Sequence, residues 1–247
     1  MPATQKRRLP EQAKNEDPAL TQPGILFMMS DVVEGTQDEF NRWYQREQLP
    51  AKLSLGGFTG ARRYHAVGGD RAYMTMYECS CIDVLSSERV SRHMAEPTPW
   101  KLKVRPTFRN LQLAACRETW SAGQGIGGAA ILVQCKALHG RADDARQFIA
   151  QQLTPRLLAA DGTVRIALWE ADEEATTAYS AQTDPNDLAN YAQWVLFVES
   201  YDLVKTALLL HTELLAHDSA RTGLLVGSFM RYRLISILHP PVAPAGA

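Results

Sequence analysis

The segment FNRWYQREQLP at residues 40–50, followed by GFTGARRY at residues 57–64, carries the strongest fold signal in this chain. Within the first segment, Phe40, Trp43 and Tyr44 have the i, i+3, i+4 spacing of an amphipathic helix. The proline that closes the first segment and the glycine that opens the second are residues that end helices. The remainder of the second segment is typical of a strand. Together the two segments predict a helix that leads through a glycine turn into a β-strand.

Outward from these segments, the first half of the chain has the element order β-α-β-β-α-β. Thr36 is a suitable N-cap for the first helix because Glu39 follows three residues later, as in a capping box. A glycine turn at residues 68–70 joins the second and third strands into a hairpin. This order is the split βαβ arrangement of ferredoxin-like proteins. The expected strands lie at residues 24–33, 58–67, 72–79 and 108–119, and the expected second helix lies at 83–94.

The same element order recurs in the second half, which indicates an internal repeat. Gln48 recurs as Gln152, 104 residues later, whereas Glu78 recurs as Glu199, 121 residues later. The second repeat therefore contains about 17 additional residues, for which the polar segment 173–190 is the natural position. Loops of that length in compact domains are often functional. The expected strands of this repeat lie at 130–138, 163–171, 193–201 and 228–238, and the expected helices at 142–160 and 203–216.

The predicted fold class is α+β, with two tandem ferredoxin-like repeats whose antiparallel sheets pack together as an α+β barrel with the helices outside. In the last strand of each repeat, Leu111 and Leu113 align with Tyr232 and Leu234. We expect this apolar face to meet the helices in both repeats. The expected division is an N-terminal tail at 1–23, repeat one at 24–120, a linker at 121–128, repeat two at 129–238 and a C-terminal tail at 239–247.

The composition excludes several classes of protein. The chain has 247 residues, of which 45% are hydrophobic, and this suffices for two domains of about 100 residues each. Its 26 Lys and Arg balance 27 Asp and Glu, so no basic surface for nucleic acid or an anionic membrane is expected. No segment has the apolar length of a membrane span or of a secretory signal. We expect a cytoplasmic protein without nucleic-acid or membrane partners.

Metals and nucleotide cofactors have no support in the motifs. The four cysteines form no Cys-x-x-Cys pair, and no Cys/His pairs have zinc-ligand spacing. The chain also lacks a glycine-rich phosphate loop, a dinucleotide fingerprint and a nucleophile elbow. The sequence therefore predicts a protein with free thiols, no metal and no cofactor.

The segments at 40–50 and 57–64 resemble the dimeric α+β barrel superfamily, and in particular its EthD-like branch. EthD-like proteins carry a Trp-Tyr-x-x-Glu-His-Leu-Pro stretch on the first helix and a Gly-Phe-x-x-Ala-Arg-Arg-Tyr stretch on the second strand. The resemblance covers roughly residues 24–118. The superfamily includes muconolactone isomerases, cofactor-independent monooxygenases, polyketide cyclases and dehydratases, and two-repeat haem proteins of the chlorite dismutase type. The resemblance thus implies the fold and leaves the reaction open.

One position departs from the EthD-like pattern, because the histidine of the first helix is Gln48 in this chain. Glutamine cannot act as a general base, although it can hydrogen-bond a substrate oxygen. If the histidine transfers the proton in the relatives, this chain has either lost that chemistry or assigned it to another residue.

Asp31 is the most specific candidate for a catalytic acid or base. It ends the apolar first strand on the face of Phe27 and Met29, and its counterpart in repeat two is Cys135, so the repeat itself does not require an acid there. At the rim of an apolar pocket the pKa of a carboxyl group would be raised, which suits proton transfer. The alternative is a strand-end aspartate that caps the following turn.

The second strand contains a dense polar run. Alternation places Arg62 and Tyr64 on one face and Arg63 and His65 on the other. The planar fork of an arginine suits a carboxylate or phenolate, and His65 is a second candidate for proton transfer. The same residues could equally form salt bridges at the barrel interface or face solvent, and the sequence leaves open which face lines a pocket.

Aromatic and histidine side chains complete the candidate site. Tyr77 is the third catalytic candidate, as a hydroxyl that orients a substrate oxygen. The further candidates for substrate binding could each be a packing, surface or capping residue instead. They are Trp43, Tyr44, Gln48, Tyr73, His93 and Trp100.

Several functions remain open at this stage. The favoured one is a cofactor-independent lyase or isomerase that transfers a proton on a small apolar carbonyl, lactone or aromatic compound. The alternative is a non-catalytic protein that binds a small molecule or another protein through a degenerate pocket. A haem-binding barrel is a third option, since His211 or His217 could supply the one axial ligand that haem requires. Because both repeats lie in one chain, a homo-oligomer is compatible with the fold but not required.

Overall fold

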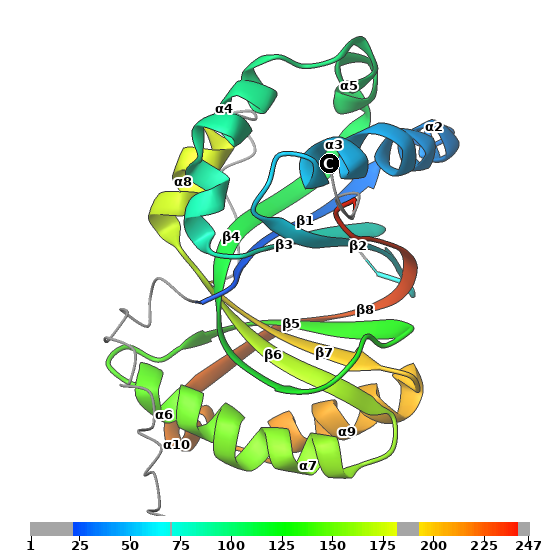
Figure 1. Ribbon diagram of the computed structural model, residues 1–247. Coiled ribbons are helices and arrows are strands. Elements are labelled where there is room, and N and C mark those ends of the chain that lie inside the picture. Colours follow the sequence, from blue (N-terminus) through cyan, green and yellow to red (C-terminus); the bar gives the residue numbers. More distant parts are fainter. Residues whose placement is uncertain (1–21, 70, 182–192, 242–247) are drawn as a thin grey trace, which may run out of the picture.

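The computed structural model describes residues 22–69, 71–181 and 193–241 of the chain. Both halves have the predicted order β-α-β-β-α-β, with additional helices in the connections (Figure 1). The end of the predicted insertion and the outer parts of both tails lie outside the described residues. No described helix is long and apolar enough to cross a membrane.

Repeat one has a nearly continuous first helix and a divided second crossover. The first helix consists of α2 (Gln37–Trp43), η1 (Tyr44–Gln48) and α3 (Leu49–Leu53). The helix predicted at 83–94 is divided, and the second crossover contains η2 (Ile82–Ser86), α4 (Glu88–Ala95), α5 (Pro99–Val104) and η3 (Arg105–Thr107). The strands are β1 (Gly24–Val32), β2 (Phe58–Ala66), β3 (Tyr73–Cys79) and β4 (Phe108–Gly123), the last of which continues into the predicted linker.

Repeat two follows the same plan and adds one helix. Its strands are β5 (Ala129–Ala137), β6 (Thr163–Ala171), β7 (Trp194–Ser200) and β8 (Leu224–Leu238). Its helices are α6 (Ala142–Gln147), η4 (Phe148–Leu153), α7 (Thr154–Ala159), α9 (Leu203–Leu215) and α10 (Ser219–Thr222). The additional helix is α8 (Glu173–Ser180), which lies in the predicted insertion.

The eight strands form one closed antiparallel barrel in the order β1-β3-β2-β8-β5-β7-β6-β4. Two seams join the repeats, because β2 pairs with β8 and β4 pairs with β6. Helices cover the outer face of each half, so that the two sheets enclose a common interior (Figure 1). This arrangement confirms the predicted barrel of two tandem ferredoxin-like repeats.

The barrel interior and the two spaces between sheet and helices hold separate apolar cores. In the interior, the rings of Trp169 and Phe197 stack with centroids 4.5 Å apart. Tyr232 also lies there, so the expectation that it meets the helices is wrong, whereas Leu113 does lie on the helix side of repeat one. The two strands differ because β4 contains one extra residue near Asn110, which has a left-handed backbone (φ 51°) and reverses the alternation beyond it.

The first helix of each repeat widens into a π-helical turn, η1 in repeat one and η4 in repeat two. A proline follows each turn, Pro50 and Pro155 respectively, and proline cannot donate the backbone hydrogen bond of a regular helix. Such turns within α-helices are frequent at functional sites. In repeat one, this turn begins with Tyr44 and ends with Gln48.

Candidate functional site

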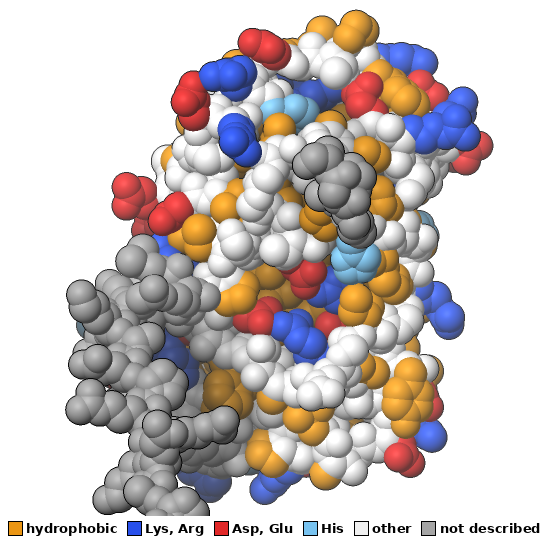
Figure 2. Space-filling model, viewed as in Figure 1, with side chains coloured by type: hydrophobic (Ala, Val, Ile, Leu, Met, Phe, Trp, Pro, Cys, Tyr) orange, Lys and Arg blue, Asp and Glu red, His pale blue; other side chains and the backbone are white. Residues whose placement is uncertain are grey.

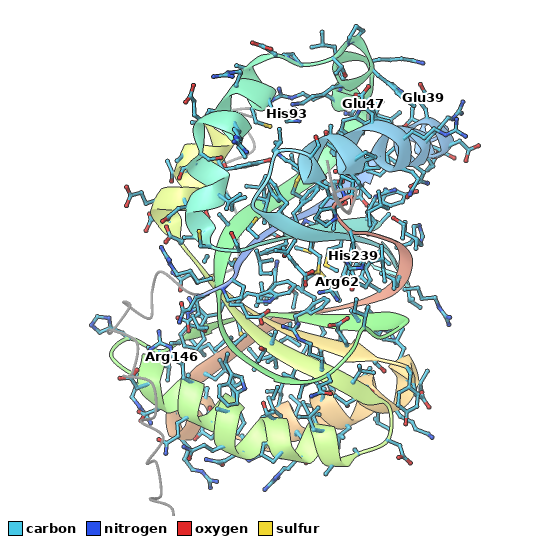
Figure 3. All side chains as sticks on the ribbon, viewed as in Figure 1. Glu39, Glu47, Arg62, His93, Arg146 and His239 are labelled. Carbon is cyan, nitrogen blue, oxygen red and sulfur yellow. The ribbon has the colours of Figure 1, made fainter. Side chains whose placement is uncertain are left out.

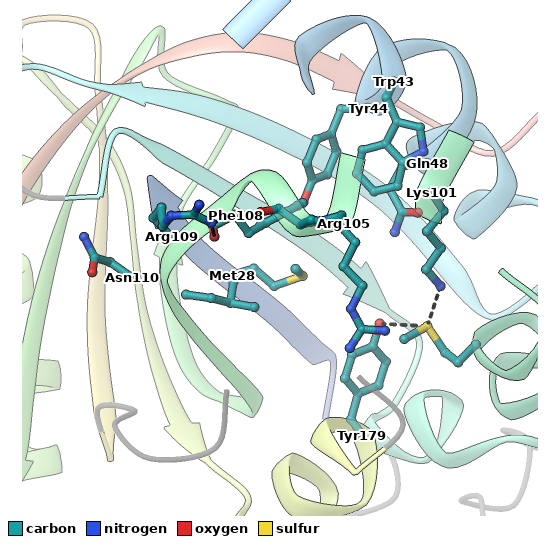
Figure 4. A pocket seen from close by; sticks show the side chains of 13 residues that line it. Met28, Trp43, Tyr44, Gln48, Lys101, Arg105, Phe108, Arg109, Asn110 and Tyr179 are labelled. Carbon is teal, nitrogen blue, oxygen red and sulfur yellow. Dashed lines mark hydrogen bonds between the residues drawn. The ribbon is translucent and has the colours of Figure 1, made fainter. Parts of the chain in front are cut away.

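A pocket of about 280 Å³ lies between the outer face of the repeat-one sheet and its helices (Figure 4). This volume is at the small end of the range for ligand pockets and suits a compound of one or two rings. Strands β1 and β4, helix η1, the second crossover and helix α8 contribute to the lining. The lining residues are Met28, Trp43, Tyr44, Gln48, Met94, Lys101, Arg105, Pro106, Phe108, Arg109, Asn110, Leu111 and Tyr179.

Aromatic rings form much of the pocket wall. The ring of Phe108 lies with its centroid 6.3 Å from that of Trp43 and 6.4 Å from that of Tyr44. The indole Nε1 of Trp43 donates a hydrogen bond to Glu47 over 2.8 Å, which fixes the ring. Burial raises the pKa of Tyr44, against the effect of the nearby Arg63 guanidinium, so the phenol stays protonated at neutral pH. The wall is thus a neutral surface that suits a flat ring.

The polar part of the lining is cationic. Lys101 of α5, Arg105 of η3 and Arg109 at the start of β4 line the pocket, and no acidic side chain is among the described lining residues. Lys101 is only 9% exposed, and burial lowers the pKa of its amine. Arginine and lysine are the side chains that bind carboxylates and phenolates. Aromatic walls beside an excess of positive charge favour a flat anion, or a compound that becomes one during a reaction.

A second amine, that of Lys52 in α3, lies directly behind the pocket lining and is fully buried. Its Nζ lies 2.7 Å from the Tyr179 hydroxyl oxygen and 3.6 Å from the Met94 sulfur. The same sulfur is also 3.6 Å from the Nζ of Lys101 (Figure 4). No described carboxylate forms an ion pair with Lys52. Lys52 therefore has a thioether and a phenol as its polar neighbours in place of an acid, whereas Lys101 shares the thioether and also lies within electrostatic range of Glu47.

This cluster disfavours positive charge. Burial, followed by the effect of Lys101, lowers the pKa of Lys52 to about 7. Burial and the same two amines lower the pKa of His93 to about 4, and its Nε2 is buried without a described hydrogen-bond partner. At neutral pH, His93 is therefore neutral, and the charged and neutral forms of Lys52 are both populated.

Tyr179 reaches this pocket from the other repeat. Its helix, α8, lies in the insertion of repeat two but packs against β4 and η2 of repeat one. Asp172 caps the helix by accepting a hydrogen bond from the Ala175 N–H, and Thr176 Oγ1 accepts one from the Ala115 N–H of β4 over 3.0 Å. The described part of the insertion is thus a helix that completes the pocket of repeat one, where a loop was expected.

Three predicted site residues, Trp43, Tyr44 and Gln48, line the pocket. Tyr77 lies behind them on β3 and is fully buried. Its hydroxyl is within reach of the Gln48 side chain but makes no hydrogen bond of normal geometry among the described residues. Burial raises the pKa of Tyr77 well above its ordinary value. Tyr77 is therefore placed to support Gln48 and not to contact a ligand directly.

His93 and Trp100 flank the pocket without lining it. Both lie on the helix side of repeat one, where Figure 3 shows His93 above the sheet in the same layer as Glu47 and Glu39. The indole Nε1 of Trp100 donates a hydrogen bond to Glu39 over 3.1 Å, which ties α5 to α2. These contacts hold the second crossover against the first helix.

Asp31 lies away from the pocket lining. Its carboxylate accepts hydrogen bonds from the Ala72 N–H over 2.7 Å and from the Asn110 side chain over 2.8 Å. Burial alone would raise the pKa of Asp31, but these hydrogen bonds outweigh it, and the pKa is lowered. The expectation of a raised pKa is therefore wrong. The carboxylate ties β1 to the turn before β3 and to the bulge in β4.

One face of β2 points into the barrel. Arg62 lies between the two sheets (Figure 3), where it bonds Glu199 of β7 over 2.6 Å and pairs with Glu78 of β3. Tyr64 is fully buried beside it, with its ring 6.0 Å from that of Phe197. Figure 2 shows acidic and basic side chains gathered at the opening between the two halves. Arg62 and Tyr64 therefore join the repeats and do not contact the pocket.

The other face of β2 points toward the helices. The Arg63 guanidinium lies 4.2 Å from the centre of the Tyr44 ring and 5.6 Å from that of Tyr73, and it donates a hydrogen bond to Asn41. His65 is exposed, with its ring 5.1 Å from that of Tyr73. Arg63 and Tyr73 thus support the aromatic wall from behind, and His65 lies outside the pocket lining.

Of the residues with a charged or phenolic side chain in this site, sequence reasoning missed Lys52, Lys101, Arg105, Arg109 and Tyr179, and it also missed the aromatic wall residue Phe108. The four-residue spacing of Gln48 and Lys52, and of Lys101 and Arg105, places each pair on one helix face and could have indicated the cationic group. Tyr179 carried no such signal, because only the folded chain brings α8 to repeat one.

The described part of repeat two does not fit a haem. His211 is exposed, with its ring 5.4 Å from that of Phe229, and the Nδ1 of His217 lies 2.6 Å from the Glu213 carbonyl oxygen. Between these helices and the sheet, the space is filled by buried apolar side chains that include Phe148, Ile149, Leu153, Leu157, Leu210 and Leu214. Among the described residues, no group of three or more His, Cys, Asp or Glu side chains could hold a metal ion.

The barrel has counterparts among solved structures, although no protein-family model and no curated protein matches the chain. An anthrone oxidase-like protein matches with a TM-score of 0.60 and 9% identity, over 91% of this chain and 97% of that one. A monooxygenase candidate from Lactobacillus acidophilus NCFM matches with a TM-score of 0.55 and 8% identity, over 89% and 97%. Chlorite dismutase from Candidatus Nitrospira defluvii matches with a TM-score of 0.53 and 11% identity, over 87% and 91%.

These similarities define the class of fold. The chain has the two-repeat architecture of dimeric α+β barrel proteins, and both repeats are covered by the matches. Identities near 10% carry the fold alone, since one fold of this kind supports many reactions. The function must therefore be argued from the pocket.

Proposed function

We propose that repeat one contains a cofactor-independent enzyme site that transfers a proton on a small aromatic carbonyl compound. This is the kind of step that isomerases and many lyases share. The observation that carries the proposal is the pocket lining, which combines aromatic rings with Lys101, Arg105 and Arg109 and contains no described acid. Such a lining stabilises the enolate or phenolate that forms when the substrate loses a proton.

Individual side chains have complementary roles in this proposal. The rings of Trp43, Tyr44 and Phe108 hold the aromatic part of the substrate, and Gln48 donates a hydrogen bond to its oxygen. Arg105 and Lys101 offset the negative charge that develops. Among the catalytic candidates from the sequence, Tyr77 supports Gln48, whereas Asp31 and His65 lie outside the pocket lining and have structural positions.

Two further considerations support this class of function. The anthrone oxidase-like neighbour and the monooxygenase candidate are named for oxidations, so their names agree with an enzyme on this fold but not with proton transfer in particular. The segments at 40–50 and 57–64 resemble the EthD-like branch of the superfamily. The replacement of the branch's histidine by Gln48 means that another residue must move the proton.

Binding is tested with 2-naphthol and its methyl ether, 2-methoxynaphthalene, by calorimetry. The ether has the same rings but cannot ionise, so we expect 2-naphthol to bind at least about tenfold more tightly, a difference of about 1.4 kcal/mol. Arg105→Met should abolish this preference, whereas Arg231→Met, an exposed site in repeat two, should leave it unchanged. Equal affinity for the two compounds in the wild type would refute the proposed anion preference.

Catalysis is tested with 2-tetralone, an aromatic ketone with acidic C–H bonds whose enol resembles 2-naphthol. The wild-type protein should accelerate the exchange of these hydrogens with deuterium oxide, followed by NMR. Tight binding of 2-naphthol without accelerated exchange would instead favour the alternative of a non-catalytic small-molecule binding protein.

A further inference from the structure

We propose that Lys52 is the base of this site and that it takes the substrate proton through the hydroxyl of Tyr179. The inference rests on the proposed function and names the group that carries it out. Neither residue was a candidate from the sequence. The two come from different repeats, Lys52 from α3 of repeat one and Tyr179 from α8 in the insertion of repeat two.

The geometry connects the amine to the pocket in one step. Tyr179 lines the pocket, and its hydroxyl oxygen lies 2.7 Å from the Nζ of Lys52. The Lys52 side chain itself is fully buried and does not line the pocket. A proton that leaves a ligand can therefore reach the amine by way of the phenol, which accepts one proton as it passes its own to Lys52.

The surroundings keep the amine available as a base. The groups that face it are Lys101 from α5, His93 and Met94 from α4, Cys79 from β3 and Tyr179 from α8. None of these side chains is acidic, apart from a thiol and a phenol whose pKa values burial raises above the ordinary range. With the pKa of Lys52 lowered to about 7, a large share of the amine is neutral at neutral pH and can accept a proton.

The proposed step balances without any further reactant. A C–H bond next to the ligand carbonyl breaks, and its electron pair becomes the enolate. The proton passes to the oxygen of Tyr179 while the phenol proton passes to Lys52, which becomes an ammonium ion. Lys101, whose Nζ shares the Met94 sulfur with Lys52, lies where it offsets the charge of the enolate. If the ammonium group exchanges its proton with solvent before the return to the same carbon, the result is hydrogen exchange, and return to another carbon is an isomerisation.

A purely structural role for Lys52 is the competing explanation, since its amine also holds α8 against α3 through Tyr179. The two explanations differ in the protonation state of the amine and in the effect of removing only the Tyr179 hydroxyl. Both differences can be measured separately from ligand affinity.

The first measurement is an NMR titration of the protein labelled with ¹³C,¹⁵N-lysine, with the Lys52 signal assigned from its loss in Lys52→Met. We expect this signal to titrate near pH 7, well below the ordinary pKa of a lysine side chain. Titration of Lys52 in the ordinary range near pH 10 would overturn the proposal, because the amine would then be protonated at neutral pH.

The second measurement is the exchange of 2-tetralone hydrogens against pH. In the wild type the rate should rise as pH passes through about 7 and Lys52 loses its proton. Lys52→Met and Tyr179→Phe should each lower the rate by about 10²–10⁴ and remove this rise, while 2-naphthol affinity changes less than about threefold. Lys103→Met, an exposed lysine outside the cluster, should retain the wild-type rate.

The outcomes separate the two proposals. Wild-type exchange that survives both Lys52→Met and Tyr179→Phe overturns the base role and leaves the proposed function intact. Absence of exchange in the wild type overturns the proposed function and the base role together. Tyr179→Phe removes a single oxygen and leaves the ring in place, so this variant tests the relay independently of Lys52→Met.

Discussion

The Tyr179 hydroxyl lies 2.7 Å from the Lys52 amine, although the two residues are 127 positions apart in the chain and belong to different repeats. Through this contact, a helix of one repeat closes the pocket of the other. The lining and the buried amine are therefore products of the whole chain, and neither repeat alone contains the site.

Removal of the buried amine should stabilise the protein in a pH-dependent way. The pKa of Lys52 is about 7 in the folded state and about 10.5 when the chain is unfolded, so between these values the unfolded state binds more protons. The cost of burying the amine is thus present in full below pH 7 and declines as pH rises toward 10.5. Lys52→Met should raise the free energy of unfolding by about 1–3 kcal/mol at pH 6.5 and by less at pH 9.5.

Urea denaturation of Lys52→Met and wild type at these two pH values checks this expectation. Lys103→Met serves as the control, because Lys103 is exposed and should show no comparable pH-dependent difference. A gain of the same size at both pH values would contradict a lowered pKa for Lys52.

The ion pairs in the barrel interior should be strongly coupled. Arg62→Met leaves the fully buried Glu199 without its closest cation, and Arg165, at 3.6 Å, is then the one cation paired with it among the described residues. Removing one partner of a buried pair typically costs about 3–5 kcal/mol. The double variant Arg62→Met/Glu199→Gln should recover part of this loss, as measured by urea denaturation. A loss below about 1 kcal/mol in the single variant would show that the pair is not desolvated.

The attachment of α8 should matter for the pocket as well as for stability. Thr176→Val preserves the shape of the side chain but leaves the Ala115 N–H without its acceptor. We expect a loss of about 1–3 kcal/mol in stability and weaker binding of 2-naphthol, because Tyr179 lies on the same helix. Thr177→Val, the same change at an exposed neighbour, should alter neither measurement. Undiminished 2-naphthol binding in Thr176→Val would separate α8 from ligand binding.

Asp31→Asn should affect stability and leave the exchange of 2-tetralone within about threefold of wild type. The amide can accept the Ala72 hydrogen bond but cannot accept a second one from Asn110, so we expect a loss of about 0.5–1.5 kcal/mol at neutral pH. Because folding lowers the pKa of Asp31, its contribution is present above the unfolded pKa and is lost as pH falls through the folded value. The variant should lack this acid-dependent loss, which denaturation between pH 3 and 7 would reveal.

Sequence periodicity predicts the fold almost completely, because the same order of helices and strands can be recognised in both halves of the chain. The i, i+3, i+4 spacing at Phe40, Trp43 and Tyr44 corresponds to a buried helix face, and the polar run of β2 alternates between barrel and helices as expected. The position of Tyr232 was not predictable by alignment with β4, since β4 has one extra residue near Asn110 and β8 is regular between Phe229 and Tyr232.

The candidate site was predictable in part. Trp43, Tyr44 and Gln48 follow from the helix pattern, and all three line the pocket. The expectation of a raised pKa for Asp31 was wrong because two hydrogen-bond partners lower it, and these partners lie 41 and 79 positions away in the chain. Local sequence patterns do not reveal such distant partners. The Lys52–Tyr179 contact likewise depends on the path of an insertion that local patterns do not specify.

Because the barrel closes within one chain, substitutions in its two halves can accumulate independently. In a barrel made from two identical subunits, every substitution occurs twice, so an adjustment that improves a cavity in one half also alters the packing of the other. Here the two halves can differ in sequence, and their interiors do differ. Repeat two has a filled apolar core, whereas repeat one has a pocket to which Tyr179 of repeat two contributes. Freedom from symmetry lets one half specialise as scaffold for the other.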